Sequence, residues 1–390
     1  MKGPKEQQEL LALRAEIDRI DQELLKNLLR RAQCALKIGQ HKQSQGMPAF
    51  DRVREREIIA SLRERNPGPL SDEALANVFT EIISACRSVQ SRTTVAFLGP
   101  EATFSHMAAV KHFGRSLQYL PCDSIAEVFR AVERGQADFG VAPVENSTEG
   151  AVGQTLDQLA VCRVSICGEV FYRISHALMS REQDFNRIRV VYSHPQALAQ
   201  CLGWLSSKLP GRAMVPTAST SAAARKTLEE ASTAAVGNEA LAALHDLKVL
   251  ARDIQDYAMN ETRFLILGYT ESRPTDRDKT SIFFATSHQP GALRAALTPF
   301  AERGINLTRI ESRPAKDKPW DYVFFVDFEG HTSQPLVQAA MRELGGCVRK
   351  LKVLGSYPAG EPADVPSSWR KLAPSESGDE PVVWAMGKFS

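Results

Sequence analysis

The chain has 390 residues, 43% of them hydrophobic and 24% charged, and a net charge of +2 at pH 7. Since one hydrophobic core rarely extends beyond about 250–300 residues, this length predicts two or three domains. The near-neutral charge argues against a protein dedicated to nucleic-acid binding. The polar start and the lack of a long apolar stretch predict neither a signal peptide nor a membrane span. The seven scattered cysteines, without CxxC spacing, predict reduced thiols, a cytoplasmic location and no metal site.

The first 45 residues predict one long helix with a buried face. No proline lies between Glu6 and Gln45, and apolar residues recur at steps of three and four. This apolar stripe consists of Leu10, Leu13, Ile17, Ile20, Leu24, Leu28, Ala35 and Ile38. Arg31 and Lys42 interrupt the stripe, and Arg14 lies on its flank. Burying a cation without an anionic partner costs several kcal/mol, so the stripe is expected to line a site for an anion, unless the cations reach solvent from its edge.

The length of this helix also predicts a dimer. About forty helical residues make a rod of roughly 60 Å. A compact domain of about 90 residues spans only about 30 Å. One copy of the N-terminal region cannot cover such a stripe, so we expect an intertwined homodimer.

Two more helices are expected at residues 51–66 and 71–90, separated by Pro67-Gly68-Pro69. Helical spacing places polar residues of both helices on their apolar sides. The inward polar set is expected to be Arg14, Arg31, Lys42, Asp51, Arg54, Glu55 and Gln90. Its four cations exceed its two carboxylates, which suits a dianion. Because no nucleophile triad accompanies the set, a reaction here would proceed by holding and polarising the substrate.

This region resembles the all-helical chorismate mutase family through Leu10-Leu11-Ala12-Leu13-Arg14, Arg31, Gly39-Gln40-His41-Lys42 and Asp51-Arg52-Val53-Arg54-Glu55. The resemblance implies a swapped helical dimer over residues 1–91 that rearranges chorismate, a dicarboxylate, to prephenate. Arg14 of the neighbouring chain, Arg31 and Arg54 would hold carboxylates. Lys42 and Gln90 would donate to the ether oxygen, and Asp51 and Glu55 would take the substrate hydroxyl and orient the cations. A structural dimerisation domain without activity is the alternative.

From Val95 onward, short β-branched runs alternate with helical stretches. This pattern predicts an α/β segment over residues 94–270, long enough for two lobes with a cleft between them. Strands are expected at 95–98, 139–142, 190–193, 234–236 and 263–267. Helices are expected at 104–113, 125–134, 155–161, 195–209, 221–230 and 239–245.

Four polar clusters border these strands: residues 99–105, 143–150, 193–198 and 260–264. Their order and spacing resemble the prephenate dehydratase family, which implies a periplasmic-binding-protein-like fold. The family converts prephenate to phenylpyruvate by loss of carbon dioxide and water. Thr262 of Thr262-Arg263-Phe264 would donate to the departing oxygen, with Glu145 as a candidate acid. The further candidate binding residues are Thr103, Asn146, Ser147, Ser193, Gln196, Arg263 and Phe264.

Several alternatives stay open in this segment. Arg263 either holds a substrate carboxylate or forms a structural ion pair. His194 either acts as a general acid or begins a helix before Pro195. The segment as a whole could prefer arogenate as substrate, or serve an inactive amino-acid sensor.

Residues 279–358 predict the order βαββαβ, with strands at 280–286, 307–313, 322–328 and 348–357 and helices at 291–303 and 335–344. Gln289-Pro290-Gly291-Ala292-Leu293 and Glu311-Ser312-Arg313-Pro314 resemble the ACT domain of prephenate dehydratases, an α+β, ferredoxin-like module. The resemblance implies phenylalanine binding at a dimer interface by Gly291, Ala292, Leu293, Glu311, Ser312, Arg313 and Pro314. A purely structural module is the alternative. Residues 359–390 are expected to be largely disordered.

Together the three resemblances imply a multidomain enzyme of two consecutive steps, an isomerase and a lyase, in phenylalanine biosynthesis. Feedback inhibition by phenylalanine is implied, as is a homodimer or tetramer. No cofactor and no nucleic-acid or membrane partner are expected.

Overall fold

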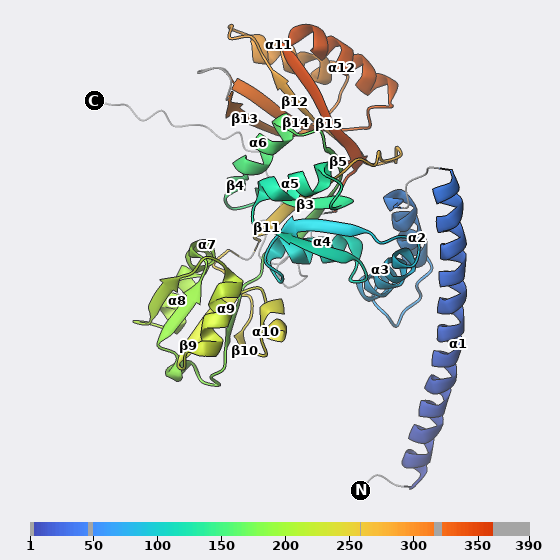
Figure 1. Cartoon of the computed structure of the whole chain (residues 1–390), viewed down its shortest axis with the longest axis vertical. Helices are drawn as coiled ribbons and strands as arrows, with labels where there is room; N and C mark the ends of the chain where they lie inside the picture. Colours follow the sequence, from blue (N-terminus) through green and yellow to red (C-terminus); the bar gives the residue numbers. More distant parts are fainter. Residues whose placement is uncertain (1–3, 46–49, 258, 316–321, 362–390) are drawn as a thin grey trace, which may run out of the picture.

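The computed structural model describes residues 4–45, 50–257, 259–315 and 322–361. An all-helical part, a two-lobed α/β part and a C-terminal α+β part follow one another (Figure 1), which confirms the predicted fold class. Most of the tail expected to be disordered lies outside the described residues. None of the described helices combines the length and apolarity needed to cross a bilayer.

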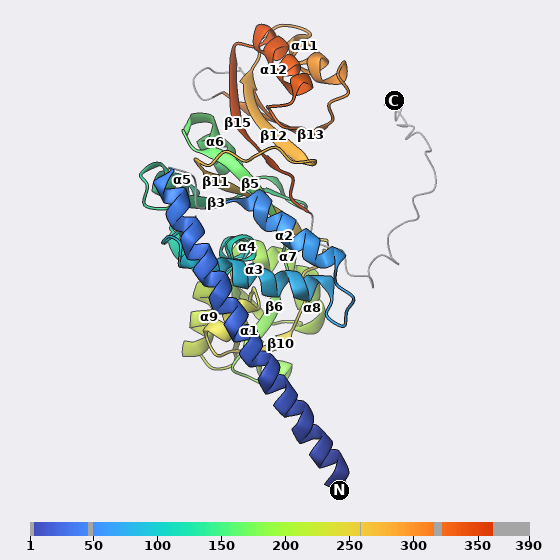
Figure 2. The same cartoon turned by 90° about the vertical axis from the view of Figure 1, so that its right-hand side faces the viewer.

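The helical part consists of α1 (Pro4–Ser44), α2 (Arg52–Glu64) and α3 (Asp72–Ser88). The side chains of Asp51 and Ser71 cap α2 and α3 by accepting from backbone N–H groups three residues later, each at 3.1 Å. A Cβ on Gly39 would lie 2.9 Å from Cβ of Gln90, so this glycine allows α1 to approach the end of α3 closely. The N-terminal half of α1 projects beyond the other elements (Figure 2).

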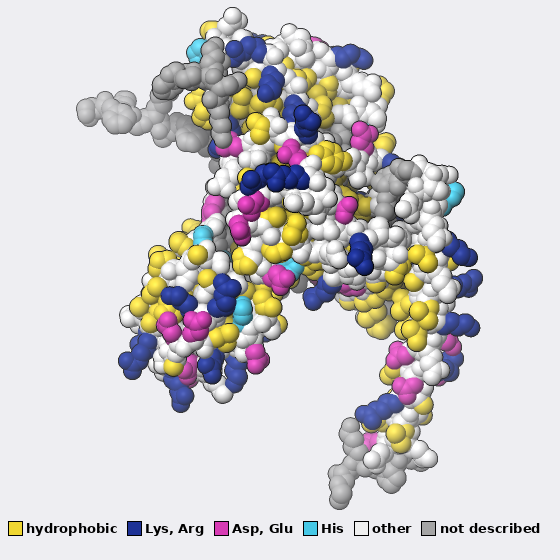
Figure 3. Space-filling view, in the orientation of Figure 1, with side chains coloured by type: hydrophobic (Ala, Val, Ile, Leu, Met, Phe, Trp, Pro, Cys, Tyr) yellow, Lys and Arg dark blue, Asp and Glu magenta, His cyan; other side chains and the backbone are white. Residues whose placement is uncertain are grey.

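The apolar stripe of α1 is not covered by its own chain. Ala35 is 8% exposed, whereas Ile17 is 56% and Leu24 54% exposed. Hydrophobic side chains reach the surface along the length of this helix (Figure 3). A monomeric protein rarely leaves an apolar surface of this extent in water.

The first lobe is built around a mixed sheet in the order β2-β1-β3-β11-β5, with β4 paired to β3. Its elements are β1 (Thr94–Leu98), α4 (Phe104–Phe113), β2 (Gln118–Cys122), α5 (Ile125–Glu133), β3 (Phe139–Asn146), β4 (Gly150–Ala151), α6 (Gly153–Val161), β5 (Ser165–Arg173) and β11 (Glu261–Gly268). On one face of the sheet, Phe113 of α4 packs against Phe97 and Phe264. On the other face, α5 and α6 pack against Leu265.

The second lobe contains a five-stranded sheet in the order β10-β6-β9-β7-β8. Its elements are β6 (Ala177–Ser180), a 3-10 turn (Phe185–Arg187), β7 (Val190–Ser193), α7 (Pro195–Gln200), α8 (Leu202–Lys208), β8 (Ala213–Pro216), α9 (Thr220–Glu229), β9 (Thr233–Gly237), α10 (Ala240–Leu244) and β10 (Lys248–Ala251). The chain enters this lobe after β5 and returns before β11. The two crossings are joined where the N–H of Ile174 donates to the carbonyl of Asn260 at 2.8 Å.

The elements of the two lobes differ from the sequence prediction in two respects. The single helix expected at 195–209 is divided into α7 and α8 at Cys201. Strands β2, β4, β5, β6, β8 and β10 were not predicted. All four expected strands and both expected helices of the C-terminal part are present, with ends shifted by a few residues.

The C-terminal part has the sheet order β13-β14-β12-β15. Its elements are β12 (Asp278–Ala285), α11 (Ala292–Ala301), β13 (Leu307–Pro314), β14 (Tyr322–Glu329), α12 (Pro335–Cys347) and β15 (Lys350–Pro358). Helices α11 and α12 cover one face through contacts such as Phe300 with Phe328. The other face shares a core with the first lobe, where Phe325 and Leu354 pack with Leu159 of α6.

The segment after β15 contacts both other parts of the protein. The N–H of Gly360 donates to Oε1 of Glu169 in the first lobe at 2.7 Å. The carbonyl of Ala359 accepts from Nη1 of Arg56 in α2 at 2.9 Å. The third part of the chain therefore ends beside the first.

Gly355 in β15 allows the C-terminal part to dock, and replacing it should weaken this docking. A Cβ at this position would overlap the backbone carbonyl of Ile166 in β5, which cannot move without disturbing the sheet. We expect Gly355→Ala to lower the free energy of unfolding by about 1–3 kcal/mol, measured by chemical denaturation. Gly346→Ala is the control, since its Cβ meets nothing within 4 Å and alanine favours the helix. Equal stability of the two variants would contradict this account.

Candidate active sites

In the helical part, several predicted residues lie around the C-terminal end of α1. Lys42 and Asp51 line a hollow of about 70 Å³ that also touches the segment from Thr270 to Arg273. Gln90 lies beside Gly39. On α1, Gly39 comes about one helical turn before Lys42. Arg31 is half-buried on the same helix, whereas Arg14 is exposed. A single chain therefore brings together most of this polar set but not Arg14.

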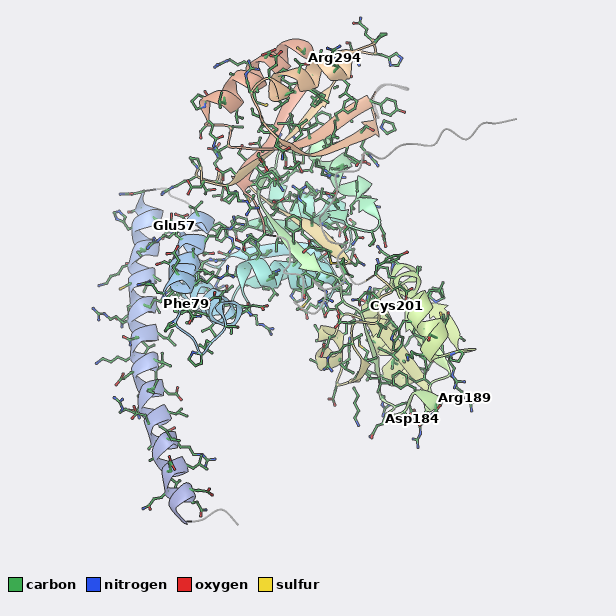
Figure 4. The ribbon with its side chains drawn as sticks, turned by 180° about the vertical axis from the view of Figure 1, so that it is seen from behind. Glu57, Phe79, Asp184, Arg189, Cys201 and Arg294 are labelled. Atoms are coloured by element: carbon green, nitrogen blue, oxygen red, sulfur yellow. The ribbon has the colours of Figure 1, made fainter. Side chains whose placement is uncertain are left out.

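In the single chain, Asp51, Arg54 and Glu55 do not all share one buried side. Glu55 is buried, with a side chain 12% exposed, but Arg54 faces solvent. Its Nη1 donates to Oε2 of Glu57 at 2.9 Å (Figure 4 labels Glu57).

In the α/β part, the ends of β3 and β11 hold a compact polar cluster. Asn146 and Thr262 lie opposite each other in the strand register. The amide nitrogen of Asn146 donates to Oγ1 of Thr262 at 2.8 Å and to Oδ1 of Asn260 at 2.7 Å. Its amide oxygen accepts from the backbone N–H of Thr148 at 3.0 Å, which fixes the orientation of the amide because a backbone N–H can only donate. Asn146 thus occupies a lone pair of Thr262 and leaves the hydroxyl proton to be donated elsewhere.

Ser147 secures the same two strand ends. Its hydroxyl donates to the carbonyl of Met259 at 3.0 Å and accepts from the N–H of Glu261 at 2.9 Å. The structure therefore brings together three of the predicted residues, Asn146, Ser147 and Thr262, and adds Asn260 to them.

Side chains from the second lobe reach across to this cluster. Nε2 of Gln200 in α7 donates to Oε1 of Glu149 at 2.7 Å, and the predicted Gln196 donates to the other oxygen of Glu149. Gln200 also contacts Nε2 of His176 at 2.8 Å. Sequence reasoning missed Glu149 and Gln200. The signals were there, since Glu149 belongs to the polar cluster at 143–150 and Gln200 lies one helical turn after Gln196.

Other predicted residues use their polar side-chain atoms in hydrogen bonds to the local backbone. Thr103 caps α4, donating to the carbonyl of Leu98 at 2.9 Å and accepting from the N–H of His106 at 3.3 Å. Ser193 is fully buried and donates to the carbonyl of Val236 at 2.6 Å. His194 caps α7, where its Nδ1 accepts from the N–H of Gln196 at 3.3 Å. For His194 the contact is the one expected of a residue that begins a helix.

Arg263 points to the opposite face of the sheet from Thr262, because successive side chains of a strand alternate. Its guanidinium is 6% exposed and donates to Glu169 at 2.6 Å, to Asp327 of β14 at 2.5 Å and to the hydroxyl of Tyr357 in β15 at 3.0 Å. These contacts are those of the structural ion pair, the second of the two alternatives.

The same alternation separates Glu145 from Thr262. Glu145 lies opposite Arg263 in the strand register, and its Oε2 forms an ion pair with Nε of Arg309 in β13 at 3.1 Å. A role for Glu145 as an acid beside Thr262 is therefore not supported by this geometry. Phe264 is buried in the core of the first lobe.

The ion cluster around Arg263 is strongly charged despite its burial. Burial alone would raise the pKa of Asp327, but Arg263, Ser281 and Arg309 hold it below its ordinary value. Glu169, whose side chain is fully buried, is paired at its second oxygen with Lys279 of β12 at 2.8 Å. Removing one partner from such a cluster would leave an uncompensated charge in the interior.

The two predicted phenylalanine motifs lie in neighbouring hollows of the C-terminal part. Gly291 has a φ of +79° and directs the chain into α11, whose Ala292 and Leu293 line a hollow of about 180 Å³. Arg313 and Pro314 line a hollow of about 470 Å³ beside α6, where Arg313 pairs with Asp157 at 3.1 Å. Glu311 is half-buried and Ser312 is exposed on the outer strand β13. Both hollows include Tyr322, but a single chain does not merge them into one site.

Comparisons with known proteins agree with these three parts. A family model for type II chorismate mutase matches residues 13–91, one for prephenate dehydratase matches 95–272, and one for the ACT domain matches 280–346. The bifunctional chorismate mutase/prephenate dehydratase of Aquifex aeolicus is 46% identical over 355 residues, covering 90% of this chain and 98% of that protein.

Two solved structures resemble the second and third parts together. The prephenate dehydratase of Arthrobacter aurescens in complex with L-Phe has 33% identity and a TM-score of 0.64, covering 72% of this chain and 97% of that one. A protein described as a quorum quenching acylase has 30% identity and a TM-score of 0.63, covering 68% and 98%. The match to the Aquifex protein extends over the helical part as well. The chain therefore belongs to the family of bifunctional chorismate mutase/prephenate dehydratases.

Proposed function

We propose that the two reactions of this enzyme occur at two separate sites, and that phenylalanine bound by the ACT domain inhibits the dehydratase. The mutase site comprises Arg31, Lys42, Asp51, Glu55 and Gln90 together with Arg14 of a second chain. The dehydratase site lies between the lobes, around Thr262. The observation that carries the proposal is the hydrogen bond from Asn146 to Oγ1 of Thr262, in a cluster that Glu149 connects to Gln200 of α7.

The mutase reaction needs positioning and electrostatics rather than a nucleophile. Chorismate breaks a C–O bond and forms a C–C bond in one step, and the ether oxygen gains negative charge as the bond breaks. Lys42 lies on α1 three residues after Gly39, which packs against Gln90 just beyond α3, and we expect both side chains to donate to that oxygen. Donors fixed in place before the reaction stabilise the developing charge without reorganising. Glu55 would accept from the substrate hydroxyl.

The geometry of α1 supports the proposal that Arg14 serves the site of another chain. Arg14 and Lys42 are 28 residues apart on one unbroken helix, about 42 Å along its axis. No side chain spans that distance. A second α1 packed against the exposed stripe would bring its Arg14 to the far end of the first, and it would cover Ile17 and Leu24. The same arrangement leaves each chain with an incomplete mutase site of its own.

A mixture of two inactive variants tests this sharing of sites. We expect Arg14→Ala and Arg31→Ala each to abolish most mutase activity, because each removes a cation that holds a substrate carboxylate. After unfolding and refolding an equal mixture, half of the dimers contain both variants, and one of their two sites is intact. Mutase activity should then recover to about a quarter of the normal value. If Arg14 served its own chain, both sites of a mixed dimer would be damaged and no activity would return.

The dehydratase reaction requires help for a departing hydroxyl group. As the ring carboxylate leaves as carbon dioxide, its electron pair enters the ring, the C–O bond to the hydroxyl breaks and the ring becomes aromatic. The departing oxygen leaves as water, with a proton supplied ultimately by solvent. Thr262 donates a hydrogen bond to that oxygen because Asn146 already occupies one of its lone pairs. Glu149, Gln196 and Gln200 join the two lobes beside this cluster.

Removing the hydroxyl of Thr262 should separate the two activities. We expect Thr262→Val, which keeps the shape of the side chain, to lower dehydratase kcat by about 10²–10⁴. Mutase activity should be unchanged, since Thr262 lies in another domain. Thr94→Val on β1 is the control and should preserve both activities. A Thr262→Val enzyme with normal phenylpyruvate formation from prephenate would contradict the assigned role.

Two observations support feedback through the ACT domain. A prephenate dehydratase solved in complex with L-Phe matches 72% of this chain. In addition, Thr262 is followed directly by Arg263, which is paired with Asp327 and Tyr357 of the ACT sheet. A shift of that sheet on phenylalanine binding would act on the strand that carries the catalytic threonine. Because ion pairs of fixed geometry join the first lobe to the ACT sheet, we expect the sheet to take discrete positions on the lobe rather than to shift gradually.

Neutralising Asp327 should weaken the inhibition. We expect Asp327→Asn to raise the phenylalanine concentration for half-inhibition by about fivefold or more, a typical size for coupling between two sites. The readout is the ratio of inhibited to uninhibited dehydratase rate. Calorimetry should show that phenylalanine still binds. Glu329→Gln, an exposed change on the same strand, is the control, and equal sensitivity of both variants to phenylalanine would reject this route.

A further inference from the structure

Glu55 of the mutase site is held by two arginines that the sequence did not single out. Its Oε1 accepts from Nη2 of Arg87 in α3, and its Oε2 lies 3.6 Å from Nη1 of Arg52 in α2. The side chains of Glu55, Arg87 and Arg52 are 12%, 5% and 20% exposed. A glutamate with one oxygen on each of two cations has lost most of its rotamer freedom.

The two arginines are in turn held in place by the dehydratase domain. The guanidinium of Arg87 lies over the ring of Phe50, 4.6 Å from its centroid. Phe50 is buried between Phe113 and Phe139 of the first lobe, with ring centroids at 5.5 Å and 5.0 Å. Nη1 of Arg52 also donates to the carbonyl of His112 in α4 at 3.3 Å. The contacts that hold Glu55 therefore continue into the neighbouring domain.

Positive charge exceeds negative charge around Glu55, so this arrangement is more than an ordinary ion pair. Two guanidiniums face one carboxylate, and among the described residues Nε and Nη1 of Arg87 have no hydrogen-bond partner. Burial lowers the pKa of Arg52 to about 10, so it stays charged at neutral pH. Burial and the nearby arginines hold the pKa of His112 well below its usual value, so that this ring is neutral. Both oxygens of Glu55 therefore face cations.

We propose that Arg87 and Arg52 are positioning residues for the mutase reaction. The first lobe of the dehydratase holds them in place, by packing around Phe50 and through the carbonyl of His112. Neither arginine needs to contact chorismate. They fix the carboxylate of Glu55 in the direction in which it accepts from the substrate hydroxyl. The inference rests on the role proposed above for Glu55. It makes the dehydratase domain part of the support of the mutase site.

The test compares Arg87→Met with the same substitution at another arginine of this domain junction. Methionine keeps an apolar stem over Phe50 but loses the charge. We expect kcat/KM for chorismate to fall about tenfold to a hundredfold, the usual effect of losing a hydrogen bond to a charged group. Arg115→Met is the control, since Arg115 pairs with Glu81 of α3 at 3.8 Å and does not touch Glu55. Dehydratase activity with prephenate should be normal in both variants, which shows that the chain has folded.

A double-mutant cycle separates positioning from general support of the fold. In a Glu55→Gln background, Arg87→Met should cause no further loss of mutase activity, because the group it positions is already gone. Arg87→Lys, which retains a cation, should recover part of the rate. Arg52→Met should give a smaller loss of the same kind, and it provides a second variant if Arg87→Met does not fold.

Two results would overturn the inference. One is mutase activity within twofold of normal in Arg87→Met. The other is a pair of losses that multiply in the double variant, which would assign Arg87 a structural role independent of Glu55. A Glu55→Gln enzyme with normal mutase activity would reject the role proposed for Glu55. The inference would fail with it, because Arg87 would then have no reacting group to position.

Discussion

The pairing of β3 with β11 is the constraint on which the rest of the α/β and ACT parts depends. Its register places Asn146 opposite Thr262 and Glu145 opposite Arg263. Because side chains alternate along a strand, one step in the sequence separates the face with the reacting hydroxyl from the face buried against the ACT sheet. A shift of the register by one residue would exchange these faces, placing a guanidinium in the cleft and a hydroxyl among carboxylates. In the proposed function, catalysis and regulation share one hydrogen-bonded strand pair.

The mutase part obeys a different constraint, namely the length of a single helix. An α1 of 41 residues cannot be covered by the two shorter helices of its own chain. Its C-terminal half is held by Gly39 against Gln90, and the other half presents its apolar side chains to the surface. In the proposed function, substrate recognition and association of chains share one continuous stripe, in which Arg14 and Lys42 contribute to opposite ends.

Much of this organisation could be read from local sequence signals. The bounds of α4 were predicted from the sequence alone, since Thr103 and Gly114 mark its ends. Features that depend on tertiary partners were not. Strand β5 carries Glu169, which is stable in the interior only because distant Arg263 and Lys279 pair with it. The face of β11 that would line the cleft was also undetermined, because the alternation of a strand says which residues share a face but not what covers it. The arginines around Glu55 were missed for the same reason.

The short segment after β15 gives the molecule a closed set of junctions. The helical part meets the first lobe where Arg52 contacts the carbonyl of His112, and the first lobe meets the ACT sheet at Arg263 and Asp327. The third junction joins the ACT part back to α2 through Ala359 and Arg56. Three bodies joined pairwise in a triangle have fewer independent motions than three in a row. Any rotation at one corner must be matched at the other two, so the catalytic halves of this polypeptide are mechanically linked even though their pockets are separate.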